Sequence, residues 1–470
     1  MLKVYNTLSR QKEDFIPTKI DRNEVRMYVC GITPYDEVHL GHARCYVVFD
    51  VIRRYLKYRG YEVKYVQNFT DIDDKIINRS RELQLAADEL ARKYIDDYFS
   101  QMSKLNILPA DAYPRVTQKI PEIIEFIKKI IENGFGYVVD GDVYFSVRKF
   151  KDYGKLSKRN IDELRVGARI MPGENKQDPL DFALWKKAKE GEPFWESPWG
   201  RGRPGWHIEC SAMSLDELGK TTLDIHGGGQ DLIFPHHENE IAQSEAALGR
   251  PFVKYWIHNG FVTVNKEKMS KSLGNFFTLR QIFEKYEPMV VRYMLLSQHY
   301  RQPLDFSEEK LQQAKSAYER IVNVKEMAEK LLKQLPDGRA GAIREMTDSF
   351  VADFVNSLDD DFNTAESLGS LHGLVNSIYL SVRDMPSGLN RESLKYQLQK
   401  LTELSNVLGL TIEAKTTIPD QIKQLVVERE EARKNKNWKL ADQLRDKIKN
   451  EGFEIEDTKF GPICRRSSAG

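Results

Sequence analysis

The sequence predicts an α/β, Rossmann-like domain with a small α+β insertion, followed by an α-helical bundle and a small C-terminal domain. Three observations support this division. An apolar run at residues 25–29 predicts a buried strand, and a histidine-containing loop links it to a predicted helix at residues 43–59. From residue 307 onward, apolar residues recur at steps of three or four, which is typical of packed helices. Beyond residue 411, the predicted helices carry many charges of both signs.

The loop after the first predicted strand, residues 30–42 (CGITPYDEVHLGH), carries His39 and His42 just before the predicted helix. A helix N-terminus presents unpaired N–H groups and partial positive charge, so it is a suitable place for phosphate. Gly41 allows a nucleotide to approach the backbone closely. Taken alone, His-x-x-His is equally well an exposed helical pair or a fragment of a metal site.

A second short stretch, KMSKS at residues 268–272, lies in a segment with loop composition. Alone, it is typical of a solvated charged loop. Combined with the histidine loop, Lys268 and Lys271 supply mobile ammonium groups that neutralise charge on a triphosphate while a carboxylate attacks its α-phosphorus. The pair of motifs predicts an adenylate-forming ATP site. Its catalytic and ATP-binding residues are expected to be His39, His42, Lys268 and Lys271, with Mg²⁺ accompanying ATP.

The chain has only four cysteines, at positions 30, 45, 210 and 464, which argues against a disulfide framework. Cys30 follows the first predicted strand, Cys210 ends the string GWHIEC, and FPHHENE follows at residues 234–240. Pro235 suits the first turn of a helix, which would put His236 and Glu240 one turn apart on the same face. Two thiolates, one imidazole and one carboxylate can form a zinc shell. The spacing alone also fits two ordinary buried cysteines beside a polar helix start.

The two ATP-site motifs together resemble the signatures of class I aminoacyl-tRNA synthetases. Longer strings make the chain similar to the cysteinyl-tRNA synthetase family over nearly its whole length: NFTDIDDK at 68–75, GRPGWHIEC at 202–210 and DIHGGG at 224–229. The resemblance implies an enzyme that activates L-cysteine with ATP and transfers it to tRNA(Cys). It also implies one zinc ion per subunit, held by Cys30, Cys210, His236 and Glu240, that binds the sulfur of the substrate.

A metal of this kind has a physical purpose. Serine differs from cysteine mainly by oxygen in place of sulfur, and a pocket that senses only shape gains about 1 to 3 kcal/mol from so small a difference. A thiol, with an ordinary pKa near ~8.5, ionises readily beside a cation, whereas an alcohol resists. No editing domain is then needed, and the stretch between residues 111 and 199 is too short for a large one.

The resemblance further implies that five residues contact the amino acid or its adenylate: Gly31, Thr70, Trp206, His226 and Asp231. His226 is expected near the substrate sulfur, and Trp206 is expected to close over the pocket. Each also has an ordinary structural interpretation, as a packed aromatic for Trp206, a loop-stabilising hydrogen bond for His226 and a helix cap for Asp231. The glycines at 227–229 indicate backbone brought close to a ligand.

We expect five segments along the chain. They are the first half of the catalytic domain (1–112), a connective insertion (113–200), the second catalytic half with the KMSKS loop (201–306), the helical bundle (307–410) and a small anticodon-binding domain (411–470). The clearest strand of the insertion is predicted at 141–147. Ser307 is predicted to cap the first bundle helix, and residues 359–365 introduce the next one.

The resemblance implies that the last segment binds RNA, with basic side chains beside Trp438 that pair with phosphates and an indole on which a base stacks. Composition alone favours the alternative, an amphipathic surface helix whose Trp438 packs inward. With 71 basic and 70 acidic residues, the formal net charge is only +1, so any RNA contact must come from local patches.

The first residues lack the pattern of a secretion signal, and no segment is apolar for long enough to span a membrane. We therefore expect a cytoplasmic, monomeric enzyme whose partners are ATP, L-cysteine and tRNA(Cys). Two rival functions remain. A paralogue that joins activated cysteine to an amino sugar would lack the anticodon-binding domain. A non-catalytic tRNA-binding paralogue would be expected to have lost lysines or zinc ligands.

Overall fold

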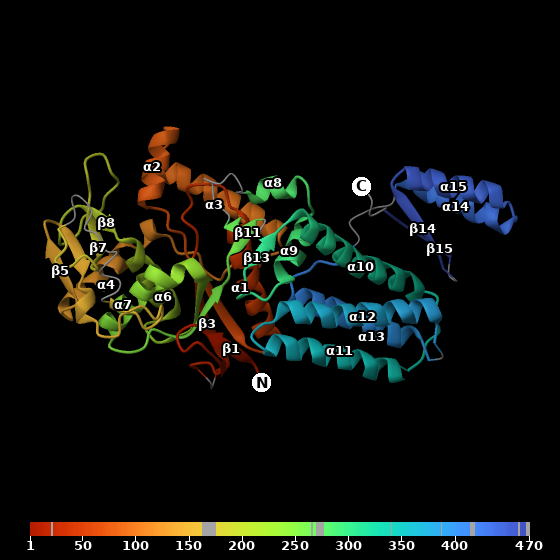
Figure 1. Ribbon diagram of the computed structural model, residues 1–470, viewed down its shortest axis with the longest axis horizontal. Coiled ribbons are helices and arrows are strands. Elements are labelled where there is room, and N and C mark those ends of the chain that lie inside the picture. Colours follow the sequence, from red (N-terminus) through yellow and green to blue (C-terminus); the bar gives the residue numbers. More distant parts are fainter. Residues whose placement is uncertain are drawn as a thin grey trace. The chain divides into compact units, whose positions relative to one another are not determined.

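The computed structural model describes residues 1–19, 22–161, 175–264, 267–268, 277–339, 341–386, 388–413, 419–458 and 461–466. The chain divides into two compact units (Figure 1). The first comprises Met1–Pro288, Gln298–Phe306 and Asp359–Phe362, and the second comprises Met289–Ser297, Ser307–Leu358 and Asn363–Gly470. Within the described ranges, no helix combines the length and the apolar character needed to cross a membrane.

The first unit is built on a parallel sheet with the strand order β10-β9-β3-β4. Its strands are β3 (Glu24–Val29), β4 (Glu62–Gln67), β9 (Leu223–Gly229) and β10 (Val253–Asn259). Helix α1 (Leu40–Tyr58) connects β3 to β4, and α7 (Glu238–Leu248) connects β9 to β10. Strands β3, β9 and β10 are largely buried, as is usual for parallel sheets. The predicted Rossmann-like fold is confirmed, and the carboxyl ends of neighbouring strands meet at one edge of the sheet.

The insertion forms an antiparallel sheet with the order β5-β6-β7-β8. Its strands are β5 (Gly136–Val139), β6 (Asp142–Phe145), β7 (Phe182–Lys187) and β8 (Gly202–Pro204). The strand predicted at 141–147 is β6. Strand β8 continues the sheet past residue 200, the boundary expected from the sequence. Helix α4 (Ile120–Glu132) precedes this sheet and buries one apolar stripe of isoleucines, at positions 120, 123, 127 and 130.

The other elements of the first unit are short strands and the helices around the sheet. They are β1 (Lys3–Asn6), β2 (Gln11–Asp14), α2 (Asp74–Leu83), α3 (Ala87–Lys104), α6 (Trp206–Leu218), β11 (Val262–Val264), β12 (Glu267–Lys268), α8 (Leu279–Phe283) and β13 (Leu304–Phe306). Helix α6 packs against α4 and α7, and the three share one hydrophobic core with the insertion. This core supports one side of the site described below.

The second unit contains a helical bundle. Its helices are α9 (Pro288–Leu296), α10 (Glu308–Leu332), α11 (Gly341–Asp359), α12 (Thr364–Asp384) and α13 (Arg391–Val407). The Ser307 side chain accepts a hydrogen bond from the backbone N–H of Lys310, so the predicted cap is confirmed. The apolar residues that predicted helix α10 are all buried: Leu311, Ala314, Tyr318, Ile321, Val324, Ala328 and Leu331.

The C-terminal segment has a hydrophobic core of its own. It consists of α14 (Asp420–Lys434), α15 (Trp438–Asn450), β14 (Phe453–Thr458) and β15 (Gly461–Arg466). The core includes Leu425, Leu444, Ile448 and Phe453. Trp438 stands at the first position of α15 and is 59% exposed. The alternative in which Trp438 packs inward is therefore wrong.

Candidate active site

A cavity of about 380 Å³ lies where β3 ends and α1 begins. Residues of the histidine loop, of the string at 68–75 and of the end of β9 line it, including Cys30, Gly31, His39, His42, Lys75, Gly229 and Asp231. Its position at the carboxyl edge of the sheet, beside a helix N-terminus, is the usual place for a nucleotide in an open α/β fold. The cavity therefore brings together residues that the sequence predicted for ATP and for the amino acid.

The two predicted histidines cap helix α1. The Nδ1 atom of His39 accepts a hydrogen bond from the backbone N–H of Gly41 at 3.1 Å, and the Nδ1 atom of His42 accepts one from the backbone N–H of His39 at 3.4 Å. Their rings stack with centroids 3.6 Å apart. The helix consequently begins at Leu40, whereas the sequence predicted a start at residue 43. The prediction missed this because histidine is not a common capping residue.

The side chain of His42 is neutral, so it does not bind phosphate as a cation. Burial lowers the pKa of His42 well below its ordinary value, and the positive charges of His39 and Lys75 lower it further. A neutral imidazole at this position can donate a hydrogen bond to phosphate but carries no positive charge of its own. Lys75, whose ammonium group lies 5.5 Å from the Tyr35 ring centroid, contributes a cation to this wall.

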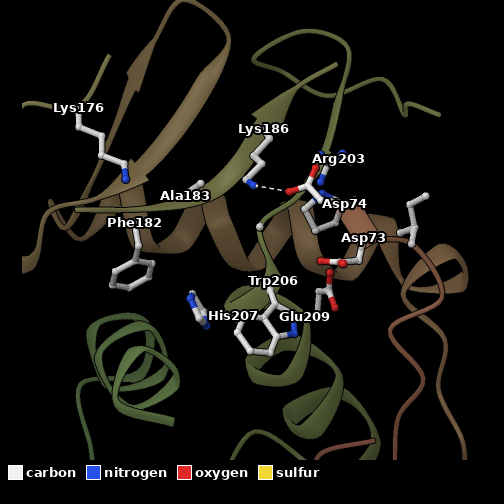
Figure 2. A pocket seen from close by; sticks show the side chains of 13 residues that line it. Asp73, Asp74, Lys176, Phe182, Ala183, Lys186, Arg203, Trp206, His207 and Glu209 are labelled. Atoms are coloured by element: carbon white, nitrogen blue, oxygen red, sulfur yellow. Dashed lines mark hydrogen bonds and ion pairs between the residues drawn. The ribbon is translucent and has the colours of Figure 1, made fainter. Parts of the chain in front are cut away.

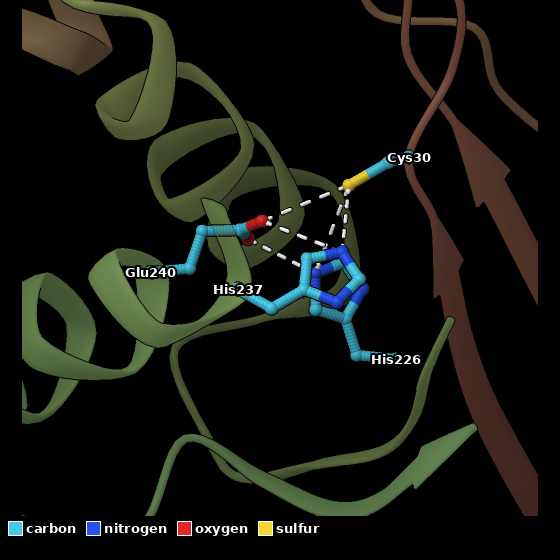
Figure 3. Close-up of side chains that lie close together, drawn as sticks. All are labelled: Cys30, His226, His237 and Glu240. Carbon is cyan, nitrogen blue, oxygen red and sulfur yellow. Dashed lines mark hydrogen bonds and ion pairs between the residues drawn. The ribbon is translucent and has the colours of Figure 1, made fainter. Parts of the chain in front are cut away.

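Cys30, which lines the cavity, also belongs to two overlapping sets of buried Cys, His and Glu side chains. Within each set the ligand atoms lie within 4.8 Å of one another, close enough to bind one metal ion. One is the set predicted from the sequence: Cys30, Cys210, His236 and Glu240. The other is shown in Figure 3 and replaces Cys210 and His236 by His226 and His237. Both contain Cys30 and Glu240, and all the side chains concerned are buried.

The predicted set fits zinc. Ordinary zinc–ligand bond lengths in a tetrahedron place two sulfurs about 3.8 Å apart, a sulfur and an oxygen about 3.6 Å apart, and a nitrogen and an oxygen about 3.4 Å apart. Here the Sγ atoms of Cys30 and Cys210 are 3.8 Å apart. The Sγ atom of Cys30 is 3.6 Å from Oε1 of Glu240, which is 3.1 Å from Nε2 of His236.

The second set departs further from that geometry. The Sγ atom of Cys30 lies 4.0 Å from Nε2 of His226 but 3.3 Å from Nε2 of His237. The Nε2 atom of His237 is 3.9 Å from Oε1 of Glu240. Each of these histidines also uses its other nitrogen in a hydrogen bond, as metal-supporting histidines do. The Nδ1 atom of His226 donates to the carbonyl of Tyr28 at 3.0 Å, and Nδ1 of His237 bonds Nε2 of His258 at 2.8 Å.

The electrostatics of the predicted set favour a positive charge at its centre. A hydrogen bond from Cys30 lowers the pKa of Cys210 to about 6. Burial would raise the pKa of Glu240, but His226 and His236 lower it to about 2. Likewise, burial would lower the pKa of His236, but Glu240 and Cys210 raise it to about 10. At neutral pH Cys210 and Glu240 are thus anionic donors, whereas burial raises the pKa of Cys30 well above its ordinary value and His236 holds a proton. A zinc ion bound here would displace the protons of Cys30 and His236.

The turn that carries His236 leads directly into helix α7. Residues Ile233–His237 form a π-type turn with a cis peptide between Phe234 and Pro235, and α7 begins only at Glu238. Within this turn only Phe234 has non-helical φ and ψ angles (−141° and 131°), so the helical run restarts at Pro235 and continues into α7. The predicted contact between His236 and Glu240, one turn apart, is confirmed.

The residues predicted to contact the amino acid lie around this cluster. The backbone N–H of Gly31 donates to Oδ1 of Asn68 at 2.8 Å, and a Cβ at Gly31 would lie 1.5 Å from the Asn68 carbonyl oxygen. Thr70 donates its hydroxyl to Oε2 of Glu209 at 2.9 Å. Trp206 is 39% exposed, and its ring centroid lies 4.5 Å from that of His236. The structure thus places Trp206 beside the cluster, with part of its indole free to contact a ligand.

The glycines at 227–229 of β9 lie close to other parts of the protein. A Cβ at Gly227 would lie 2.2 Å from the Phe49 ring, and one at Gly228 would lie 2.7 Å from Leu232. At Gly229 it would lie 2.4 Å from Oδ1 of Asp231. Tight packing within the protein therefore accounts for these glycines, and of the three only Gly229 also lines the cavity.

A second cavity, of about 260 Å³, is lined by Trp206 and other residues at the start of α6 and by residues of the insertion sheet (Figure 2). Figure 2 shows the indole beside His207 and Glu209, below the ion pair of Asp74 with Lys186, whose atoms are 3.0 Å apart. Asp74 also pairs with Arg203 of β8. These pairs connect the start of α2 to the insertion sheet.

Comparison with known proteins identifies the family. A family model described as the class I (C) catalytic domain of tRNA synthetases matches residues 16–316, and a DALR-domain model matches residues 353–413. A cysteine–tRNA ligase from Endomicrobium trichonymphae is 54% identical over 470 residues, covering 98% of each chain. One from a Sulfurihydrogenibium species is 51% identical, covering 99% of this chain and 100% of the relative. The chain belongs to the cysteine–tRNA ligase family.

Solved structures support the fold assignment. A methionyl-tRNA synthetase from Mycobacterium tuberculosis, in complex with methionyl-adenylate, aligns with a TM-score of 0.59 at 17% identity, over 82% of this chain and 89% of that one. A putative arginyl-tRNA synthetase from Campylobacter jejuni aligns with a TM-score of 0.55 at 13% identity, over 83% and 94%. The resemblance to class I aminoacyl-tRNA synthetases predicted from the sequence is confirmed.

Two predicted residues of this cysteine–tRNA ligase family member cannot be placed fully. Lys271 lies outside the described residues, and only the backbone of Lys268 is described, in β12, where it pairs with Thr263. Conversely, sequence reasoning missed His237 and Lys75 as site residues. Lys75 ends the string NFTDIDDK, which supported the family resemblance, and His237 lies in FPHHENE, which supported the metal prediction. Neither residue was predicted, because the sequence does not show which of several neighbouring side chains faces a cavity.

Proposed function

We propose that this protein is a cysteine–tRNA ligase that joins L-cysteine to tRNA(Cys) in an ATP-dependent reaction, releasing AMP and pyrophosphate. One observation carries the proposal. A buried pair of cysteines with His236 and Glu240 fits a zinc shell, and it lies next to the histidine-capped cavity at the carboxyl edge of the sheet. Family membership at about half identity over the full chain supports the same activity.

In the first step, the cysteine carboxylate attacks the α-phosphate of ATP, and cysteinyl-adenylate forms. His39 and His42 hold the phosphates by hydrogen bonds at the N-terminus of α1, where the helix dipole also favours negative charge. Lys268 and Lys271 supply mobile positive charge, together with Mg²⁺ bound to ATP. Catalysis is mainly positioning and electrostatic stabilisation, because no protein nucleophile is required.

Substrate selection depends on the cysteine-containing cluster. A zinc ion held by Cys30, Cys210, His236 and Glu240 would supply a Lewis acid that binds a thiolate far better than an alcohol. Trp206, half-exposed beside His236, closes over the amino acid. Gly31, Thr70, His226 and Asp231 complete the pocket around the amino acid. This arrangement makes a separate editing site unnecessary.

In the second step, the terminal ribose of tRNA(Cys) attacks the adenylate carbonyl. We assign the segments 1–112 and 201–306 to the catalytic domain, 113–200 to the connective insertion, 307–410 to the bundle and 411–470 to anticodon binding. The exposed Trp438 and the separate core of the last segment support that final assignment. We expect the enzyme to act as a monomer in the cytoplasm, which sedimentation and cell fractionation test.

The proposed function is tested by ATP–pyrophosphate exchange with cysteine and with serine, on protein of known zinc content, before and after zinc removal. Exchange that requires cysteine and is lost with zinc is the expected result. Exchange with neither amino acid in zinc-replete protein would overturn the activity, and equal exchange with serine would overturn the selection by zinc. The amino-sugar alternative is not favoured, because such an enzyme would lack the segment that carries Trp438.

A further inference from the structure

Tyr28 belongs to the wall of the metal cluster, although neither its sequence motif nor the proposed function gives it a role. It lies on β3 two residues before Cys30, so the two side chains leave the chain on the same side. In the sheet it pairs with His226 of β9. Nδ1 of that histidine donates to the Tyr28 carbonyl, and the two ring centroids are 5.2 Å apart.

The hydroxyl of Tyr28 is buried and has no hydrogen-bond partner among the described residues. Leaving a buried hydroxyl without a partner costs about 1 to 3 kcal/mol, so such groups normally have a partner in the functional state. Tyr28, Cys30 and Cys210 are buried in one cluster of side chains. A phenol carries its proton at neutral pH, so the Tyr28 hydroxyl is available as a donor beside these sulfurs.

Of the two sulfurs, Cys210 is the one that needs a donor. Cys30 already has Nε2 of His237 at 3.3 Å. The Cys210 sulfur lies 3.8 Å from Oδ1 of Asn68, but that oxygen is an acceptor, because the backbone N–H of Gly31 donates to it. Without a metal, Cys30 donates to the Cys210 sulfur and His236 also stabilises the thiolate. With zinc bound, Cys30 would be a thiolate and His236 a ligand, so Cys210 would lose both of these donors.

We propose that Tyr28 is a positioning residue of the metal site, whose hydroxyl donates a hydrogen bond to the Cys210 thiolate when zinc is bound. The inference rests on the zinc site of the proposed function. Two thiolates and one carboxylate bring three negative charges to an ion with two positive ones, and the substrate thiolate adds a fourth. A hydrogen bond to the Cys210 sulfur withdraws part of this charge, which strengthens the shell and favours binding of the substrate sulfur.

The test compares Tyr28→Phe with the wild-type full-length protein. Zinc affinity is measured by competition with a chromophoric chelator, and thermal unfolding is measured with and without zinc. We expect zinc affinity to fall about 10- to 100-fold, as for other groups that support metal ligands. The metal-free melting temperature should stay equal or rise, because the lost hydroxyl had no partner. The rise in melting temperature on adding zinc should be smaller, and the KM for cysteine in pyrophosphate exchange should increase more than kcat falls.

Tyr65→Phe is the matched control. Tyr65 is buried on the neighbouring strand β4, and its hydroxyl donates to Oε1 of Gln67 at 3.0 Å. This variant should lose melting temperature equally with and without zinc and should bind zinc as the wild type does. The same behaviour in Tyr28→Phe, or unchanged zinc affinity, would overturn the inference while leaving the zinc site intact. Failure of the wild type itself to bind zinc would overturn the zinc site together with the inference.

Discussion

The sulfur atoms of Cys30 and Cys210 lie 3.8 Å apart, although 180 residues separate them in the chain. Cys30 follows the central strand β3, and Cys210 lies on α6, which packs against α4 and α7 in the core shared with the insertion. The distance between the sulfurs is therefore set by the packing of the catalytic fold. It equals the separation of about 3.8 Å that two thiolates have on a tetrahedral zinc ion.

This relationship predicts that Cys210→Ala lowers zinc content and cysteine activation together. Zinc per chain, measured by mass spectrometry of the purified protein, should fall from about one to well below it, because a tetrahedral site loses a charged ligand. Cysteine-dependent pyrophosphate exchange should fall more than about 100-fold. Cys464→Ala is the control, since Cys464 packs in the separate C-terminal core. Full zinc content in Cys210→Ala would refute the ligand assignment.

The depressed pKa of His42 predicts a specific loss of stability in acid. Unfolded histidine takes up a proton below about pH 6.5, whereas the folded His42 resists protonation, so the free energy of unfolding falls as the pH drops through that range. Between pH 6.5 and 5.5, the wild type should lose up to about 1.4 kcal/mol more than His42→Gln. Thermal unfolding at the two pH values measures this, and parallel losses in both proteins would contradict it.

Lys271 is expected to act in the transition state of adenylate formation. Lys271→Ala should therefore slow pyrophosphate exchange at saturating cysteine by about 10²- to 10³-fold, with little change in cysteine affinity, because the ammonium group balances charge that develops on the phosphates. Steady-state kinetics with cysteine and ATP varied separately provide the measurement. A variant with normal kcat and a raised KM for cysteine would show that Lys271 has a different role.

The exposed indole of Trp438 predicts a contact with RNA. If a base stacks on it, Trp438→Ala should weaken tRNA(Cys) binding by about 1 to 3 kcal/mol and impair charging, while pyrophosphate exchange without tRNA stays unchanged. Trp438→Phe keeps an aromatic face and should retain much of the affinity. Val427→Ala, at a position 57% exposed on α14, serves as a second control. Equal charging by Trp438→Ala and the wild type would remove Trp438 from the RNA interface.

Several local features could be predicted from the sequence because they depend on neighbours along the chain. The cap at Ser307 and the buried stripe of α10 follow from side-chain chemistry and from helical periodicity. The prediction for α1 erred by one turn because its cap is made by histidine side chains. The helical run that starts at Pro235 was also predicted, because proline suits a first helical turn, and it brings His236 to Glu240 one turn later.

The sequence by itself determined the family, the Rossmann-like fold, the histidine and lysine motifs and the set of four candidate zinc ligands. These depend on residue types and on spacing along the chain. Only the tertiary structure decided that Cys30 and Cys210 meet and that His237 lies against Cys30 while His236 contacts Glu240. It also decided that the Tyr28 hydroxyl is buried with no partner in the described part of the chain. The physical reason is that distances between segments far apart in the chain depend on how strands and helices pack, which no local pattern of residues encodes.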